Sequence, residues 1–208
     1  MEQHVEQGLV AYQALLTDRT ELDELINLVA TVSVDHLSQT QKKAFYINSY
    51  NLLVIKGIVN KYPVESPLKI EGFFDKVEYR VAGEVMTLND LENHKLREGI
   101  QDARIHFVLV CAAHGCPRLV NFAYRPEHLA AQLEQQTRQA LNDRNFIRVD
   151  KRQKQVLISE IFKWYEKDFI KESGSVRKFL NLYRTEKIPS GFRLEYYPYD
   201  WSLNEQKS

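Results

Sequence analysis

The chain has 208 residues, of which 44% are hydrophobic and 11% aromatic, enough to build a core in one domain or in a domain with a small subdomain. Its 28 basic residues balance 28 acidic ones, which argues against the single-sign field of a nucleic-acid binder. No apolar run approaches the roughly 20 residues needed to span a bilayer, so we expect no transmembrane segment. The first residues lack the pattern of a signal peptide, although an exported chain whose leader was removed would look the same.

Helical spacing of apolar residues predicts two helices in the first third of the chain, over residues 21–30 and 39–61. The second helix has clear boundary signals. Ser38 and Gln41 form the pattern of a reciprocal capping box, and Pro63 follows its end.

The next segments alternate between strand and helix patterns. Residues 77–82 and 84–86 predict a hairpin around Gly83, and Thr87 is placed to cap a short helix that ends at Arg97. The apolar run over 104–111 predicts a buried strand.

The second half continues in the same mixed style. It predicts helices over 126–142, 161–170 and 176–183, and strands over 146–150, 155–159 and 193–198. Hairpin-like pairs and short connections favour a mainly antiparallel sheet flanked by helices, so we predict an α+β fold in a single domain over 1–208.

Two asparagines interrupt the apolar stripe of the long helix. Asn48 and Asn51 lie on the same rows as Ile47 and Ile55, so we expect both carboxamides to be buried. An unpaired buried amide costs about 1–3 kcal/mol, so each should have a defined partner. Two roles remain open: a structural clamp on a crossing loop, which is the commoner use of a buried amide, or the orientation of a catalytic group.

Glu92 and Arg97 lie on the short helix that follows the predicted hairpin. Five residues separate them, which is too far round an α-helix for an ideal ion pair, so each should face a partner elsewhere. A lone glutamate on a short helix is more often a surface residue than a catalytic one.

Both cysteines of the chain lie close to His106. In an extended strand, His106 and Cys111 would be about 16 Å apart and on opposite faces, which excludes a direct dyad. A thiol nucleophile at Cys111 or Cys116 would then need a base from elsewhere, and His114 follows in the next turn. The other candidate bases are His36, His94 and His128.

Three roles for the two cysteines remain open: buried structural residues, a short-range disulfide, or one nucleophile. A closed zinc site needs four ligands, and the cluster offers at most Cys111, His114 and Cys116. We therefore predict neither a metal nor a cofactor.

Four motifs in order along the chain resemble the Domain of Unknown Function 547 family. They are Ala44-Phe-Tyr-Ile-Asn-Ser-Tyr-Asn51, Leu91-Glu92 with Leu96-Arg97, His106-Phe-Val-Leu-Val-Cys111 with Cys116-Pro117, and Phe162-Lys-Trp-Tyr-Glu-Lys-Asp-Phe169. The resemblance extends from about residue 8 to residue 204. The family's recurring polar positions match Asn48, Tyr50, Asn51, Glu92, Arg97, His106, Cys111, Cys116 and Asp168.

The resemblance carries implications of its own. Many bacterial members look exported or lipid-anchored, which favours an extracytoplasmic location. Plant members often replace the second cysteine, so a bridge between Cys111 and Cys116 cannot be the function that the family shares. Asn93 stands where many members carry histidine, and His114 falls at a position that the family leaves free.

These observations favour a cysteine-dependent hydrolase or acyl transferase, papain-like or transglutaminase-like in layout, acting on a small molecule or peptide. Its polar cleft would lie around residues 106–116, with catalytic candidates Cys111, Cys116, His106, Glu92, Asn48 and Asn51. In this hypothesis Glu92 or an asparagine holds the imidazole. The alternatives are a binding or scaffold module, with recognition by the aromatic segment 196–201, and a thiol redox element. The oligomeric state is left open.

Overall fold

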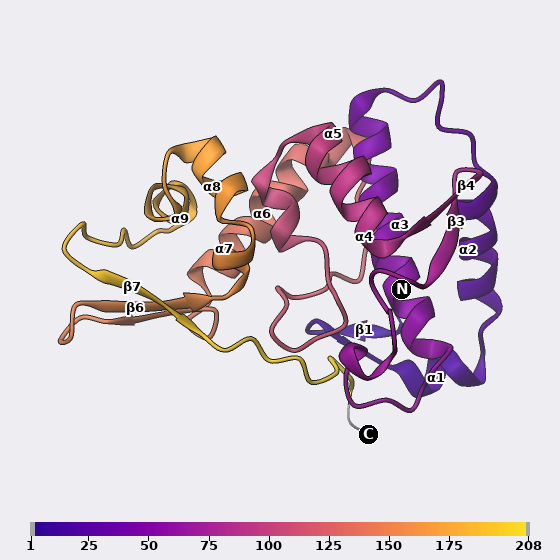
Figure 1. Cartoon of the computed structure of the whole chain (residues 1–208), viewed down its shortest axis with the longest axis horizontal. Coiled ribbons are helices and arrows are strands. Elements are labelled where there is room, and N and C mark those ends of the chain that lie inside the picture. Colours follow the sequence, from indigo (N-terminus) through magenta and orange to yellow (C-terminus); the bar gives the residue numbers. More distant parts are fainter. Residues whose placement is uncertain (1–2, 207–208) are drawn as a thin grey trace.

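The computed structural model describes residues 3–206 and combines helices with three small sheets (Figure 1). The α-helices are α1 Tyr12–Thr17, α2 Thr20–Thr31, α3 Gln39–Val59, α4 Leu88–Asp90, α5 Glu98–Ile100, α6 Leu129–Asn142, α7 Ile161–Trp164, α8 Glu166–Ser173 and α9 Val176–Tyr183. Short 3₁₀ turns are η1 Pro67–Lys69, η3 Ala103–Phe107 and η4 Pro126–His128, and η2 Leu91–Arg97 is a π-helix. This arrangement confirms the predicted α+β class.

The strands form two hairpins and one three-stranded sheet. They are β1 Val5–Glu6, β2 Leu9–Val10, β3 Glu78–Val81, β4 Glu84–Thr87, β5 Ile147–Asp150, β6 Gln155–Ser159 and β7 Arg193–Tyr197. Of the four strand pairs within residues 3–206, three are antiparallel, as predicted. The β6–β7 pair is parallel, because α7, α8 and α9 lie between the two strands in the chain and provide the crossover that parallel pairing requires.

Helix α3 is the longest element of the fold and begins where the sequence predicts. The Ser38 hydroxyl accepts from the Gln41 backbone N–H, and the Gln41 side chain accepts from the Ser38 N–H, so the predicted capping box is present. Ile47 and Ile58 are fully buried. The π-helix η2, which carries Glu92, and the turn η4 also pack against this helix.

The predicted strand over 104–111 is wrong. Residues 103–107 form the 3₁₀ turn η3, and 108–111 continue without regular structure. The side chain of Asn51 on α3 donates to the carbonyl of Val108 and accepts from the N–H of Val110, at 2.9 Å each. A side chain thus satisfies backbone groups that a neighbouring strand would satisfy in a sheet, and apolar periodicity alone cannot distinguish these cases.

Smaller differences concern element boundaries. The predicted helix over 161–170 is divided at Tyr165 into α7 and α8, and the one over 126–142 begins as the 3₁₀ turn η4. Thr87 caps the next helix as predicted, but that helix changes from α4 to the π-helix η2 after one turn. The sequence did not indicate β1, β2 or α1.

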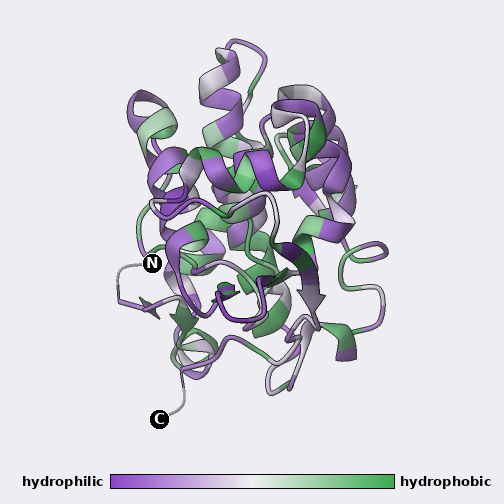
Figure 2. Ribbon diagram, turned by 90° about the vertical axis from the view of Figure 1, so that its left-hand side faces the viewer, coloured by the Kyte–Doolittle hydropathy of each residue, from purple (hydrophilic) through white to green (hydrophobic). Residues whose placement is uncertain are grey.

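Two groups of buried hydrophobic residues form the core. One includes Ile47 and Leu91 with the first half of the chain, and the other includes Phe107 and Phe162 with the second half. Individual helices carry both hydrophobic and hydrophilic residues along their length, as amphipathic elements do (Figure 2). The partly buried side chain of Cys116 packs against both groups, so this cysteine lies where the two parts of the core meet.

The C-terminal segment links the two halves of the molecule. After β7 it runs from the sheet of β5–β7 back toward β1 and α1 (Figure 1). The N–H groups of His114 and Gly115 donate to the carbonyls of Ser202 and Asp200, and the N–H of Asn204 donates to the carbonyl of Ala112. The C-terminal segment thereby fixes the turn between the two cysteines. Within residues 3–206, no helix has the length and apolar character needed to cross a membrane.

Candidate functional site

His106 is held by a carboxylate that comes from α8. Its Nε2 lies 2.9 Å from Oδ2 of Asp168, and Arg97 donates to both oxygens of the same carboxylate, at 2.8 and 3.2 Å. The hydrogen bonds from His106 and then Arg97 hold the pKa of Asp168 well below its usual range. An ionised carboxylate only accepts hydrogen bonds, so Nε2 of His106 carries the proton in this pair.

The imidazole of His106 is also fixed by aromatic contacts. It stacks on the ring of Tyr165, with 3.9 Å between ring centroids and 22° between planes, and Phe169 meets it edge-on at 5.4 Å. The side chain of His106 is only 2% exposed. Its second nitrogen, Nδ1, has no hydrogen-bond partner among residues 3–206. In the neutral ring this nitrogen is therefore an unused acceptor.

The two cysteines are adjacent in space and are both free. Their sulfurs lie 2.7 Å apart, and the hydroxyl of Tyr199 is 3.0 Å from Sγ of Cys111 and 2.9 Å from Sγ of Cys116. The N–H of Cys111 donates to Sγ of Cys116 at 3.1 Å. Ala112, between them, has a left-handed φ of 61°, which an alanine adopts at some energetic cost, so the surrounding contacts enforce this turn.

The surroundings act in opposite directions on the two thiols. The hydrogen bond with Cys116, together with burial, raises the pKa of Cys111 well above its usual value. Burial also acts to raise the pKa of Cys116, but hydrogen bonds from Cys111, Tyr199 and backbone amides outweigh it and lower that pKa. The pair thus carries its negative charge on Cys116 first, with Cys111 as the protonated partner.

The predicted asparagines both act as clamps on backbone. Asn51 holds Val108 and Val110, as described above. Asn48 donates to the carbonyl of Tyr124 and accepts from its N–H, at 2.9 Å each. Each carboxamide therefore uses its donor and its acceptor on a crossing loop, which is the structural role considered for them. Asn51 positions the three residues directly before Cys111.

A cavity of about 370 Å³ brings several candidates together. Glu92, His106 and Cys111 all line it, although the sequence predicted that His106 and Cys111 would point to opposite faces. That prediction depended on an extended strand, and the 3₁₀ turn η3 removes its basis. The remaining lining residues are Tyr50, Phe74, Asp75, Asn89, Leu109, Ile161, Trp164, Tyr165, Tyr199 and Trp201.

Glu92 does not orient the imidazole. Asp168 occupies that position. Glu92 forms no ion pair with any other of residues 3–206 and instead has a side-chain hydrogen bond with Tyr165. As the five-residue spacing predicts, Arg97 also has its partners elsewhere, in Asp168 and in Asn93 at 2.6 Å.

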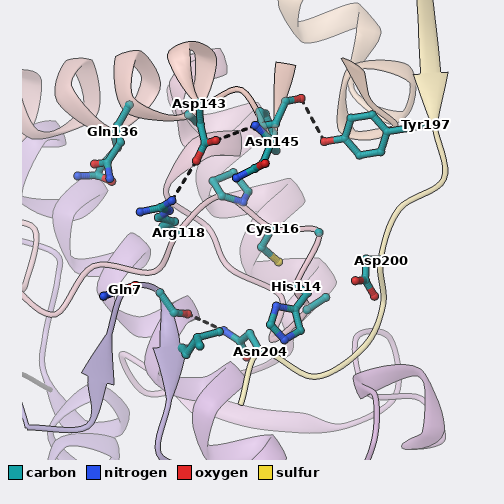
Figure 3. A pocket seen from close by; sticks show the side chains of 18 of the residues that line it. Gln7, His114, Cys116, Arg118, Gln136, Asp143, Asn145, Tyr197, Asp200 and Asn204 are labelled. Carbon is teal, nitrogen blue, oxygen red and sulfur yellow. Dashed lines mark hydrogen bonds and ion pairs between the residues drawn. The ribbon is translucent and has the colours of Figure 1, made fainter. Parts of the chain in front are cut away.

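A second cavity, of about 430 Å³, lies on the side of Cys116 (Figure 3). His114 and Asp200 line it near the sulfur, and Arg118 pairs with Asp143 across from them, at 3.1 Å. The two sulfurs and the hydroxyl of Tyr199 therefore lie between the two cavities. His114 is exposed, and it makes no hydrogen bond to either sulfur within the described part of the chain.

The other predicted bases lie away from the thiols. His36 and His128 are exposed, and His94 pairs with Glu98 on the surface, at 3.0 Å. Over residues 3–206, no three His, Cys, Asp or Glu side chains are grouped so as to hold a metal ion.

The chain matches a protein-family model. The model described as "Protein of unknown function, DUF547" matches residues 34–141, which is half of the chain. The chain belongs to the DUF547 family. Comparisons with curated proteins and with solved structures gave no match. The DUF547 segment contains Glu92, His106 and both cysteines, whereas Asp168 lies beyond its end.

Two residues at the site were not among the predicted catalytic candidates. Asp168 belongs to the Phe162–Phe169 motif through which the chain resembles DUF547, so that motif was the available signal. Tyr199 lies in the aromatic C-terminal segment, which the sequence offered only as a recognition element. Its contact with both sulfurs spans more than 80 residues of chain, and no local pattern indicates it.

Proposed function

We propose that this protein is a cysteine-dependent acyl-transfer enzyme, a hydrolase or transferase, in which Cys111 is the nucleophile and His106 the base. One observation carries the proposal: Asp168 occupies Nε2 of His106 and leaves Nδ1 without a partner, and His106 lines the same cavity as Cys111. Asp168 corresponds to the third residue of a catalytic triad, because it fixes the tautomer of His106 and stabilises the imidazolium that forms on it.

The chemistry follows from these roles. Cys111 is a thiol at neutral pH, since its pKa is raised, so attack needs a base. As Sγ of Cys111 bonds to the carbonyl carbon of the substrate, its proton passes to Nδ1 of His106. The leaving group takes that proton when the tetrahedral intermediate collapses to a thioester on Cys111. Water or an amine then attacks the thioester, His106 again moves the proton, and the thiol is regenerated.

Acylation by an activated ester tests the proposal. After incubation with p-nitrophenyl acetate, peptide mass spectrometry should locate the acetyl group on Cys111. His106→Gln should slow acylation about 100-fold or more, the usual size of a general-base contribution. His94→Gln is the matched control, since His94 is exposed and pairs only with surface carboxylates. Acetyl on Cys116 alone, or equal rates in the two histidine variants, would refute the assignment.

A second candidate, thiol–disulfide exchange, is favoured by the 2.7 Å separation of the sulfurs and the lowered pKa of Cys116. The Cys116 thiolate would attack a disulfide of the partner molecule and release one thiolate. Cys111, once deprotonated, would attack Sγ of Cys116 and release the second, so that the partner is reduced and the cysteines become a disulfide.

Cys116→Ser separates the two functions. Exchange requires both sulfurs, so this variant should lose all reduction of glutathione disulfide. Acyl transfer requires only Cys111, so the variant should still form the acetyl-enzyme. Retained disulfide reduction in Cys116→Ser would eliminate the exchange mechanism written here.

A further inference from the structure

The cavity beside Cys111 contains a carboxylate that has no cationic partner among residues 3–206. Glu92 is 9% exposed and lies near the start of the π-helix η2, in the wall of the cavity. No lysine, arginine or histidine of residues 3–206 forms an ion pair with it, and its side-chain hydrogen bond is with the neutral hydroxyl of Tyr165. A largely buried carboxylate is costly to keep ionised unless a cation or donors compensate for lost water.

The rest of the lining provides aromatic faces and no positive charge. None of the lysines or arginines of residues 3–206 lines this cavity. Tyr199 and Trp201 lie 4.7 Å apart between ring centroids, and Trp164 lies 5.0 Å from Tyr199 and 5.8 Å from Trp201. Aromatic faces attract organic cations through the negative potential above the ring. Asp75, an exposed residue, adds a second carboxylate to the lining.

The charge of Glu92 acts on the groups around it. Burial first, and then the charge of Glu92 and its hydrogen bond with Tyr165, raise the pKa of Tyr165. Burial and the charge of Glu92 raise the pKa of Tyr50. Arg97 interacts with Glu92 through space, but its guanidinium donates its hydrogen bonds to Asp168 and Asn93. Among the described residues, the lining of the cavity therefore includes the carboxylates of Glu92 and Asp75 and no lysine or arginine.

We propose that this cavity binds a cationic alkylammonium group of the substrate, with Glu92 accepting its hydrogen bonds and the aromatic residues enclosing its alkyl stem. A volume of about 370 Å³ is within the range of small-molecule sites. The inference rests on the proposed function only in placing this group beside the nucleophile. It assigns an amine-bearing substrate to the site, whether the amine belongs to the acyl donor or to the acceptor.

Intrinsic fluorescence provides a local probe of binding. The chain has two tryptophans, Trp164 and Trp201, and both line this cavity. Titration with n-butylammonium at low ionic strength should give a saturable change in fluorescence. Neutral n-butanol, which has nearly the same shape, should bind at least about tenfold more weakly, because it lacks the charge that Glu92 attracts.

Two variants identify the carboxylate responsible. Glu92→Gln should weaken n-butylammonium binding about tenfold or more and leave n-butanol binding unchanged. Glu98→Gln is the matched control, because Glu98 lies just after η2 and pairs with His94 on the surface. Circular dichroism checks that both variants are folded. If Glu92→Gln does not fold, the comparison of the two ligands on the wild-type protein, with its expected weakening by salt, still decides the question.

Equal affinity of the wild-type protein for n-butylammonium and n-butanol would overturn the inference, as would unchanged n-butylammonium binding in a folded Glu92→Gln variant. The titration contains no acyl donor, so its outcome does not depend on acyl transfer. Cation binding without an acetyl-enzyme would refute the proposed function alone. An acetyl-enzyme without cation preference would refute this inference alone.

Discussion

Replacing Asn51 by leucine tests whether the α3 clamp positions the segment that carries Cys111. The substitution removes two hydrogen bonds, and it leaves the carbonyl of Val108 and the N–H of Val110 without partners in residues that are 1% and 3% exposed. Each orphaned buried group costs about 1–3 kcal/mol, so the two together cost about 4 kcal/mol. Burying the leucine returns about 1 kcal/mol. We therefore expect the free energy of unfolding to fall by about 3 kcal/mol.

Urea unfolding followed by circular dichroism measures this loss. In thermal unfolding, the midpoint temperature should fall by about 6–12 °C for a chain of this size. Asn48→Leu is the matched control. It removes the same pair of hydrogen bonds, here to Tyr124, which is 3% exposed. The Asn48 side chain is only partly buried, so water can reach this contact from its side and replace part of what is lost. The control should lose about half as much stability as Asn51→Leu.

A loss below about 1 kcal/mol in Asn51→Leu would refute the clamp as the main support of residues 108–110. Equal losses of stability in the two variants would also refute it, because the burial of Asn51 would then have no influence on the loss. A second readout concerns the site. If the clamp aligns Cys111, the Asn51→Leu protein that remains folded should form the acetyl-enzyme more slowly than Asn48→Leu.

Three further outcomes are expected. Burial acts to raise the pKa of Asp102, but hydrogen bonds from basic side chains outweigh it and lower the pKa to about 2 from 3.8, so this carboxylate stabilises the fold above about pH 4. The contribution of about 2 kcal/mol should be lost as pH falls from about 4 to about 2, and Asp102→Asn should remove this part of the pH dependence of urea midpoints. Asp168→Asn should slow acylation of the enzyme at least about tenfold without unfolding it, because the acceptor that fixes the His106 tautomer is lost; a rate equal to wild type would argue against the triad. Gly57→Ala would place a Cβ 2.7 Å from Cε2 of Phe73, so thermal unfolding should show a loss of about 1–3 kcal/mol.

Local patterns predicted much of the fold. Helix α9, the hairpin of β3 and β4 and the capping box of α3 lie where the sequence places them, because caps, turn residues and apolar spacing act over a few residues. The α+β class followed from their order. The single domain and the papain-like or transglutaminase-like layout stay predictions.

The segment between His106 and Cys111 shows where local patterns fail. Its run of apolar residues predicts a strand, and only the contact with Asn51, more than 50 residues away, shows that the chain bends instead. That single difference decides whether His106 and Cys111 face the same cavity. The catalytic roles given to them remain a proposal until acylation is measured.

The sequence by itself determined which chemistry is available: two thiols, a nearby histidine, a glutamate and asparagines on helices, in the order typical of the DUF547 family. Only the tertiary structure decided which of them meet. Asp168 reaches His106 from 62 residues away, and Tyr199 reaches Cys111 from 88 residues away. Contacts at such separations depend on how whole elements pack, so no periodicity or motif spacing encodes them locally. That Glu92 lacks a cationic partner is a property of the same kind, because only the folded chain shows that no cation of residues 3–206 forms an ion pair with it.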